Sequence, residues 1–168
     1  MSIRSIIICV LVFSVITKNY AQQSSFIITK QPQTFKHSFG ATLGLMSSGL
    51  SYKLSYGSYA TQVTAIPIWD ENVKYMSIGL TQIKAIPLKS VSDVEFLLYG
   101  ACSYNYHESN SFNALTSKTH EINLGLGGGG RIVVSFLSLQ GLLGLRPYLS
   151  NGTFRSNVSI EASVFLDL

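Results

Sequence analysis

Apolar and polar residues alternate along most of the chain from Ser38 onwards. In HEINLGLGGGG, residues 120–130, Ile122, Leu124 and Leu126 fall on one side of an extended strand, and polar residues or glycines fall on the other. Side chains of a strand point alternately to its two faces, so this segment predicts a strand with one apolar face. The bare glycines indicate that the opposite face meets a crowded interior.

The same alternation predicts eight strands. We expect them at about 38–46, 50–56, 59–69, 73–84, 93–106, 120–130, 131–145 and 157–168. The connections between them are predicted at SSG (47–49), in YGS near 57–58, at DEN (70–72), 85–92, the polar loop 107–118, the short return GGGR (128–131) and the polar loop 146–156. Pro67 cannot donate to a sheet, which indicates a bulge or the frayed outer end of its strand. Short turns between successive strands predict an antiparallel meander.

The strand charges decide which face meets lipid. Lys53, Glu95, Glu121 and Glu161 all lie on the glycine and serine face, and the opposite face is almost uncharged. A sheet in hydrocarbon must close on itself to pair its backbone, and eight strands leave an interior that side chains fill. We therefore predict an all-β fold, an eight-stranded antiparallel up-and-down transmembrane β-barrel. Burial of the apolar face against a second sheet is the alternative interpretation.

Aromatic residues lie near the predicted strand ends, as in the interfacial girdles of membrane barrels. They are Tyr56, Tyr59, Trp69, Tyr75, Tyr106 and Tyr148.

The beginning of the chain predicts export. Residues 1–21 have the pattern of a signal peptide, with Arg4 before the apolar stretch 5–16 and Ala21 at the expected cleavage point. We expect residues 22–37 to be a periplasmic lead-in and 38–168 to be the barrel. Loss of Arg4 and Lys18 with the signal lowers the formal charge from +4 to +2, and no Lys/Arg cluster remains that would bind nucleic acid.

The sequence contains no catalytic, cofactor or metal signature. His37, His107 and His120 lack the spacing of metal ligands, and Cys102 is the one cysteine after the predicted cleavage. The strand carboxylates lie on different strands without a nucleophile–base arrangement. We therefore expect no enzyme activity and no cofactor.

Two interior charges suggest an ion pair. Lys53 and Glu161 lie on strands that flank the first strand, about 10 Å apart at the usual strand spacing, above its small residues. We expect a lumen ion pair between them, supported by Ser51 and Ser163; solvation of each by lumen water is the alternative. The other predicted polar groups of the lumen are Glu95, Glu121 and Asn123.

Residues 38–168 resemble the small outer-membrane β-barrel proteins of Gram-negative bacteria, the OmpA-like/porin-family class. The resemblance rests on FGATLGLMSSGLSYKLSYG, INLGLGGGGRI and VSIEASVFLDL. It implies a place in the cell outer membrane, contact with outer-membrane lipid and insertion by the outer-membrane assembly machinery. Members commonly end in an aromatic residue, whereas this chain ends in Leu168 with Phe165 on the other face.

The expected function is that of a monomeric, non-enzymatic outer-membrane barrel that serves as a surface anchor, a contact protein or an envelope-maintenance protein. A small channel or transport-associated barrel is one alternative. A secreted, soluble, lipocalin-like barrel that binds an apolar ligand is another.

Overall fold

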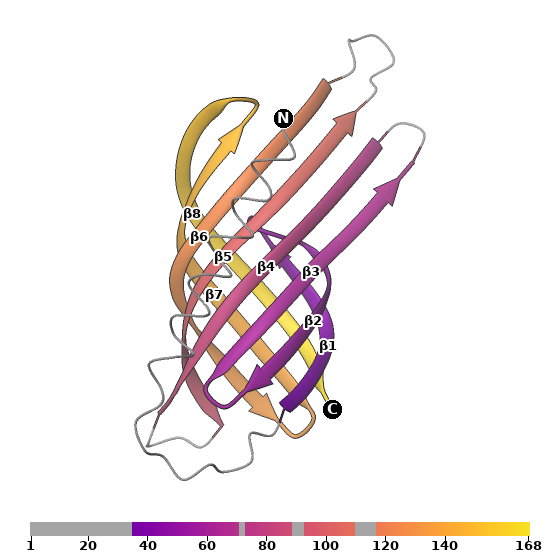
Figure 1. Cartoon of the computed structure of the whole chain (residues 1–168). Coiled ribbons are helices and arrows are strands. Elements are labelled where there is room, and N and C mark those ends of the chain that lie inside the picture. Colours follow the sequence, from indigo (N-terminus) through magenta and orange to yellow (C-terminus); the bar gives the residue numbers. More distant parts are fainter. Residues whose placement is uncertain (1–34, 71–72, 89–92, 110–116) are drawn as a thin grey trace. The chain divides into compact units, whose positions relative to one another are not determined.

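The computed structural model describes residues 35–70, 73–88, 93–109 and 117–168. The predicted signal peptide and most of the predicted lead-in lie outside the described residues. The described part forms eight strands in chain order (Figure 1). They are β1 (Phe35–Gly44), β2 (Gly49–Tyr56), β3 (Tyr59–Trp69), β4 (Val73–Pro87), β5 (Val94–Ser109), β6 (Ser117–Val134), β7 (Leu137–Ser150) and β8 (Thr153–Asp167).

Each strand pairs antiparallel with its neighbour in the chain, and β1 also pairs with β8, so the sheet closes into an up-and-down barrel (Figure 1). The predicted eight-stranded antiparallel barrel is confirmed. We call the end where β1 begins and β8 ends the terminal end, and the opposite end the hairpin end.

The strands are staggered around the barrel. Pairings followed from Ala41 through Leu50 and on around the sheet reach Phe154 of β8, whereas Ala41 itself pairs with Val164. The register is therefore shifted by ten residues along β8, from 154 to 164. A closed sheet with such a shift has strands tilted by roughly 35–45° to its axis.

The glycine run lies inside β6, so the predicted short return at GGGR is wrong. Residues 127–130 pair with β7 residues 141–144. The chain reverses only after Val134, at Ser135, whose φ of 58° is the left-handed conformation that tight hairpins require. The two strands therefore continue further toward the terminal end than the sequence predicted.

The predicted polar loop 146–156 is also wrong. β7 continues to Ser150 and β8 begins at Thr153, so a tight turn at Asn151 and Gly152 joins them. Both turn residues have positive φ, 46° and 84°. An Asn–Gly pair between alternating segments is a strong hairpin signal that the sequence interpretation overlooked.

As predicted, the outer face of the barrel carries large apolar side chains and the inner face carries polar ones. Leu43, Leu126 and Ile160 point outward and are 74, 71 and 62% exposed, whereas Lys53 and Glu161 point inward and are 0 and 2% exposed. Large apolar side chains outside and polar ones inside reverse the usual arrangement of a protein in water. Among the described residues, no helix is long and apolar enough to span a membrane.

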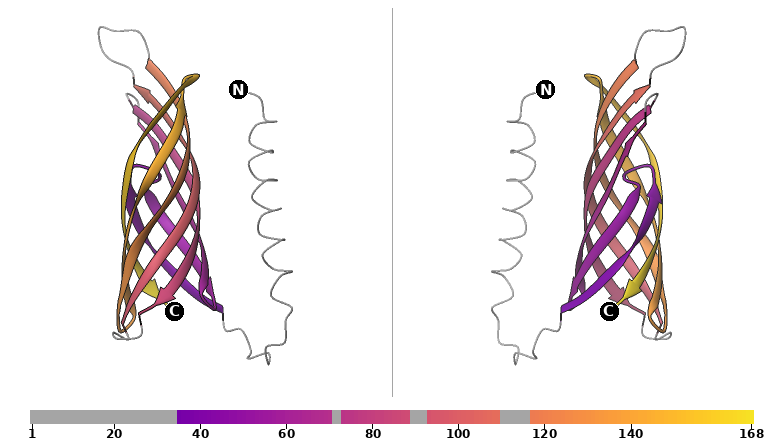
Figure 2. Two further views of the ribbon diagram at one scale, coloured as in Figure 1. Left: turned by 90° about the vertical axis from the view of Figure 1, so that its left-hand side faces the viewer. Right: turned by 90° about the vertical axis from the view of Figure 1, so that its right-hand side faces the viewer.

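The β1–β2 hairpin is much shorter than the others. β1 ends at Gly44 and β2 begins at Gly49, well below the neighbouring hairpins (Figure 2). Beyond it, residues 66–69 of β3 pair only with β4, and residues 153–160 of β8 have their strand pairing with β7. Pro67 thus lies at an edge toward the outer end of its strand, in agreement with its predicted place.

Candidate functional site in the closed lumen

Hydroxyl and amide side chains fill the middle of the lumen. The side-chain N–H of Gln140 donates to Oε1 of Gln62 at 3.1 Å. Because β7 and β3 lie opposite each other in the closed ring, this bond crosses the full width of the lumen. Thr42 accepts from Gln62 at 3.0 Å and hydrogen-bonds Ser51 at 2.7 Å and Ser163 at 2.9 Å. Side chains therefore close this level of the barrel.

Lys53 closes the level nearer the terminal end. Its ammonium nitrogen lies 3.9 Å from the centre of the Phe165 ring and donates to Oγ of Ser138 at 3.4 Å. Ser138 in turn donates to Oδ1 of Asp167 at 3.3 Å. The carboxylate linked to Lys53 is therefore that of Asp167, through one hydroxyl group.

The predicted ion pair between Lys53 and Glu161 is wrong, since no ion pair within the described residues joins them. The register supplies the reason. Lys53 is level with Ser38 and, across it, with Asp167, whereas Glu161 is level with Gly44. Six residues of β8 separate positions 161 and 167, about 20 Å at the usual rise per residue. The prediction that the strands of Lys53 and Glu161 flank the first strand was correct, but it did not include the stagger between the strands.

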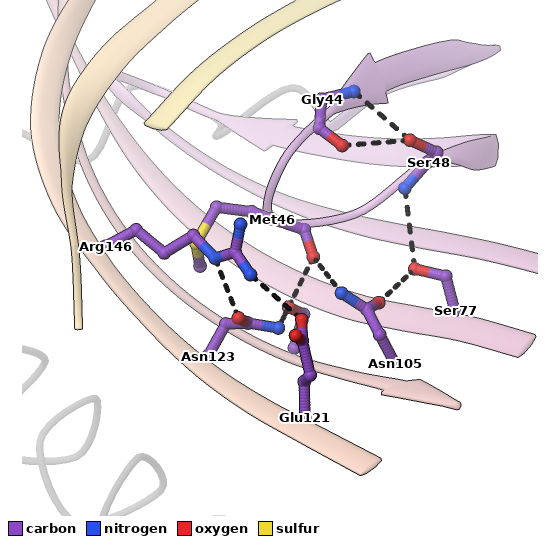
Figure 3. A network of polar contacts seen from close by, with 9 residues as sticks. Gly44, Met46, Ser48, Ser77, Asn105, Glu121, Asn123 and Arg146 are labelled. Atoms are coloured by element: carbon purple, nitrogen blue, oxygen red, sulfur yellow. Dashed lines mark hydrogen bonds and ion pairs between the residues drawn. The ribbon is translucent and has the colours of Figure 1, made fainter. Parts of the chain in front are cut away.

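Two arginine–glutamate pairs lie toward the two ends of the lumen. Arg131 of β6 donates from Nε to Glu95 of β5 at 2.7 Å. Toward the hairpin end, Arg146 of β7 donates to Glu121 at 2.9 Å and to the Asn123 side-chain oxygen at 2.8 Å (Figure 3). The predicted lumen positions of Glu95, Glu121 and Asn123 are therefore observed, and both arginines are partners that the sequence interpretation missed.

Residues 45–48, which we call the inward segment, bend so that Met46 and Ser47 enter the barrel, rather than forming the predicted tight turn. Met46 and Ser47 are almost completely buried. The Met46 carbonyl accepts hydrogen bonds from the Ser103 hydroxyl and, at 3.3 Å, from the Asn105 amide (Figure 3). The segment is thus bonded to β5 across the lumen, and it closes the lumen toward the hairpin end.

Glycines make room for the inward segment. A Cβ on Gly125 would lie 2.8 Å from Cε of Met46, and one on Gly79 would lie 2.6 Å from Cβ of Ser47. Ser48 fixes the start of the segment, because its hydroxyl donates to the Gly44 carbonyl at 3.0 Å (Figure 3). Small residues on β4 and β6 are therefore needed for this closure.

The glycine run of β6 accommodates the ring of Tyr99. This ring points inward from β5, and a Cβ on Gly127 would lie 2.8 Å from its Cε1 atom. The Tyr99 hydroxyl oxygen would lie 2.5 Å from a Cβ on Gly144 of β7. Leu97 and Tyr99 break the apolar–polar alternation of β5 because both face this glycine-lined space, where they are 0 and 5% exposed.

A charged cluster lies at the hairpin end on the outward side of β4, β5 and β6. Lys74 and Lys118 lie 3.5 and 3.8 Å from the Glu108 carboxylate, and the Tyr106 hydroxyl donates to the same group. Glu108 is next to the last residue of β5, beyond the exposed apolar side chains. The hydrogen bond from Tyr106 and the two ammonium groups hold the pKa of Glu108 below its usual value.

The described residues contain no cluster of three or more metal-ligating side chains. The histidines do not meet. Instead each lies against a tyrosine of a neighbouring strand: His37 against Tyr52, His107 against Tyr75, and His120 against Tyr104 and Tyr106. Cys102 is half-buried and is not part of a disulfide.

Comparison with known proteins gives a likeness to two solved barrels. The chain aligns with Neisserial surface protein A at 18% identity, covering 80% of this chain and 94% of that one, with a TM-score of 0.48. It aligns with the N-terminal β-barrel domain of Pseudomonas aeruginosa OprF at 9% identity, covering 80% and 96% of the chains, with a TM-score of 0.46. No protein-family model matches the chain, and no curated protein sequence matches it.

Proposed function

We propose that this chain is a non-enzymatic outer-membrane β-barrel protein with a closed lumen, which presents its hairpin end at the cell surface. The observation that carries this proposal is the exposed apolar belt. Leu126, Leu143 and Leu145 are more than half exposed on the outside, opposite an interior of hydroxyls, amides and charges. In water this surface would favour aggregation, whereas in a bilayer it is fully compatible with its surroundings.

The same belt supports outer-membrane lipid as the principal contact of the barrel and a monomeric state. Pairing of β1 with β8 closes the sheet over residues 38–44 of β1, which is how a sheet satisfies its backbone in hydrocarbon. Insertion would require the outer-membrane assembly machinery. In this role the barrel anchors its hairpin end at the surface, for contact with other molecules or for maintenance of the envelope.

The filled lumen argues against the channel alternative. The Gln62–Gln140 bond, the Lys53–Ser138 bond and the inward segment each cross the interior at a different level. A conducting path would require all three to rearrange. The soluble, lipocalin-like alternative requires an apolar interior, and the buried Gln62 and Asn123 side chains do not fit that requirement.

Fractionation and conductance together test this proposal. We expect the full-length protein to remain in the outer-membrane fraction after a high-salt wash and to migrate faster in detergent gels before heating than after it. In planar bilayers the refolded barrel should give no sustained single-channel steps. Recovery in a soluble fraction without detergent would contradict the membrane proposal, and regular conductance steps would support the channel alternative.

A further inference from the structure

Unpartnered buried polar atoms gather at one place in the lumen. Five buried side-chain polar atoms in the described residues lack a hydrogen-bond partner: one belongs to Gln140, and the others are both carboxylate oxygens of Glu161, the hydroxyl of Ser159 and the hydroxyl of Tyr99. Glu161, Ser159 and Tyr99 are each at least nine-tenths buried. Buried polar groups normally have partners, so this concentration indicates that a water molecule or an ion supplies the missing contacts.

The register brings these groups together. Tyr99 pairs with Gly127, Gly127 with Gly144 and Gly144 with Ser159, so the tyrosine side chain runs over two glycines toward Ser159. The two hydroxyls face each other without meeting hydrogen-bond geometry. Glu161 follows Ser159 by two residues on the same inward face. Ser159 is therefore a neighbour of both Tyr99 and Glu161 inside the lumen.

The negative charge of Glu161 has no neutralising side chain in the described residues. Arg146 is held by Glu121 and Asn123, and Lys53 lies at the level of Asp167. The backbone N–H groups of Met46 and Ser47 approach the carboxylate, but neither carries a full positive charge. An ionised carboxylate buried without a counter-charge is strongly unfavourable, so the group takes up either a proton or a cation, and a cation at this place would stabilise the ionised form.

We propose that Glu161, Ser159 and Tyr99 bind a sodium ion in the lumen. The available ligand atoms are all oxygens, which hard cations prefer. One carboxylate supplies one negative charge, so a monovalent ion gives a neutral site, whereas a divalent ion would leave an uncompensated positive charge in a buried place. This inference is independent of the biological role proposed above.

Thermal unfolding of the refolded full-length barrel in detergent tests the site. Midpoints are compared in sodium chloride and in N-methylglucamine chloride at equal ionic strength, which keeps screening the same. We expect the midpoint to rise with sodium concentration by several degrees and to saturate, because a ligand that binds only the folded state stabilises it by mass action. Sodium NMR line broadening measures binding directly.

Variants distinguish the site from a general salt effect. Glu161→Gln should remove the sodium response and the line broadening, whereas the control Glu121→Gln, which changes the lumen glutamate held by Arg146, should keep both. If Glu161→Gln does not fold, Tyr99→Phe replaces it and should raise the sodium concentration for half effect several-fold. Equal midpoints in the two salts for the unmodified protein, or an unchanged sodium response in both variants, would overturn the proposal.

Discussion

At the scale of single residues, the glycines of β6 and β7 serve two different purposes. Gly127 faces inward, where the Tyr99 ring and the β7 backbone occupy the position of a side chain. Gly141 lies on the outer surface, and a Cβ added there would meet no atom within 4 Å. The same residue type is therefore required for packing at one position and is replaceable at the other.

We expect Gly127→Ala to lower the free energy of unfolding by about 1–3 kcal/mol, the usual cost of overpacking. Gly141→Ala should be neutral or stabilising by up to about 1 kcal/mol, because alanine restricts the unfolded chain. Urea unfolding of the refolded barrel in detergent micelles measures both. Equal effects of the two substitutions would show that the Tyr99 ring does not rely on the inward glycine.

Arg146 is the central partner of the polar groups near the hairpin end. Arg146→Gln leaves Glu121 as a partly buried carboxylate without its cation, and we expect a loss of about 3 kcal/mol in the free energy of unfolding. The exposed Arg155 is the matched control, and Arg155→Gln should change stability by less than about 0.5 kcal/mol. Adding Glu121→Gln to Arg146→Gln should restore part of the loss, and a strictly additive double variant would contradict the pairing.

At the scale of elements, the inward segment gives adjacent residues opposite environments. Leu45 is half exposed on the outside, and Met46 is buried in the lumen. In a Cys102→Ser background, a small methanethiosulfonate reagent should label Leu45→Cys more than an order of magnitude faster than Met46→Cys, because reaction requires access to the thiol. Similar labelling rates in a barrel that still shows heat-modifiable migration would mean that the segment does not stay inside.

The strands were predictable because alternation is a local property of the sequence. Residues of the second strand, such as Leu50 and Lys53, fall on the correct faces without any knowledge of their partners. The ends of β6, β7 and β8 were missed because glycine and polar content were taken as signs of a connection. Arg131 and Arg146 consequently remained outside the predicted lumen.

Contacts across the lumen were not predictable, because they depend on the stagger of the whole sheet. The Lys53–Glu161 hypothesis required the depth of each residue, and a single strand does not contain this information. Pairing of Lys53 with Asp167 through Ser138 follows only when the shift of ten residues is known. The inward segment also had no local signal, since SSG is equally typical of an ordinary turn.

At the scale of the whole barrel, the apolar belt predicts a dependence on depth. Leu143 lies outward in the middle of β7, and Phe154 lies outward near the hairpin end of β8. For folding into lipid bilayers, Leu143→Arg should cost about 2–4 kcal/mol and Phe154→Arg about 0–1 kcal/mol. Reversible unfolding from vesicles measures the difference, and equal costs would place the bilayer elsewhere on the barrel.

The shortness of the β1–β2 hairpin also determines how the lumen meets its surroundings. Ten tilted residues of β1 are about enough to cross the hydrocarbon layer, whereas β5 and β6, with 16 and 18 residues, continue beyond that height. The rim of the barrel is therefore high on one flank and low on the other. A small ion that enters from the hairpin end would reach Glu161 past the inward segment. It would approach this segment from the side where β1 and β2 end, at the level of the lipid headgroups.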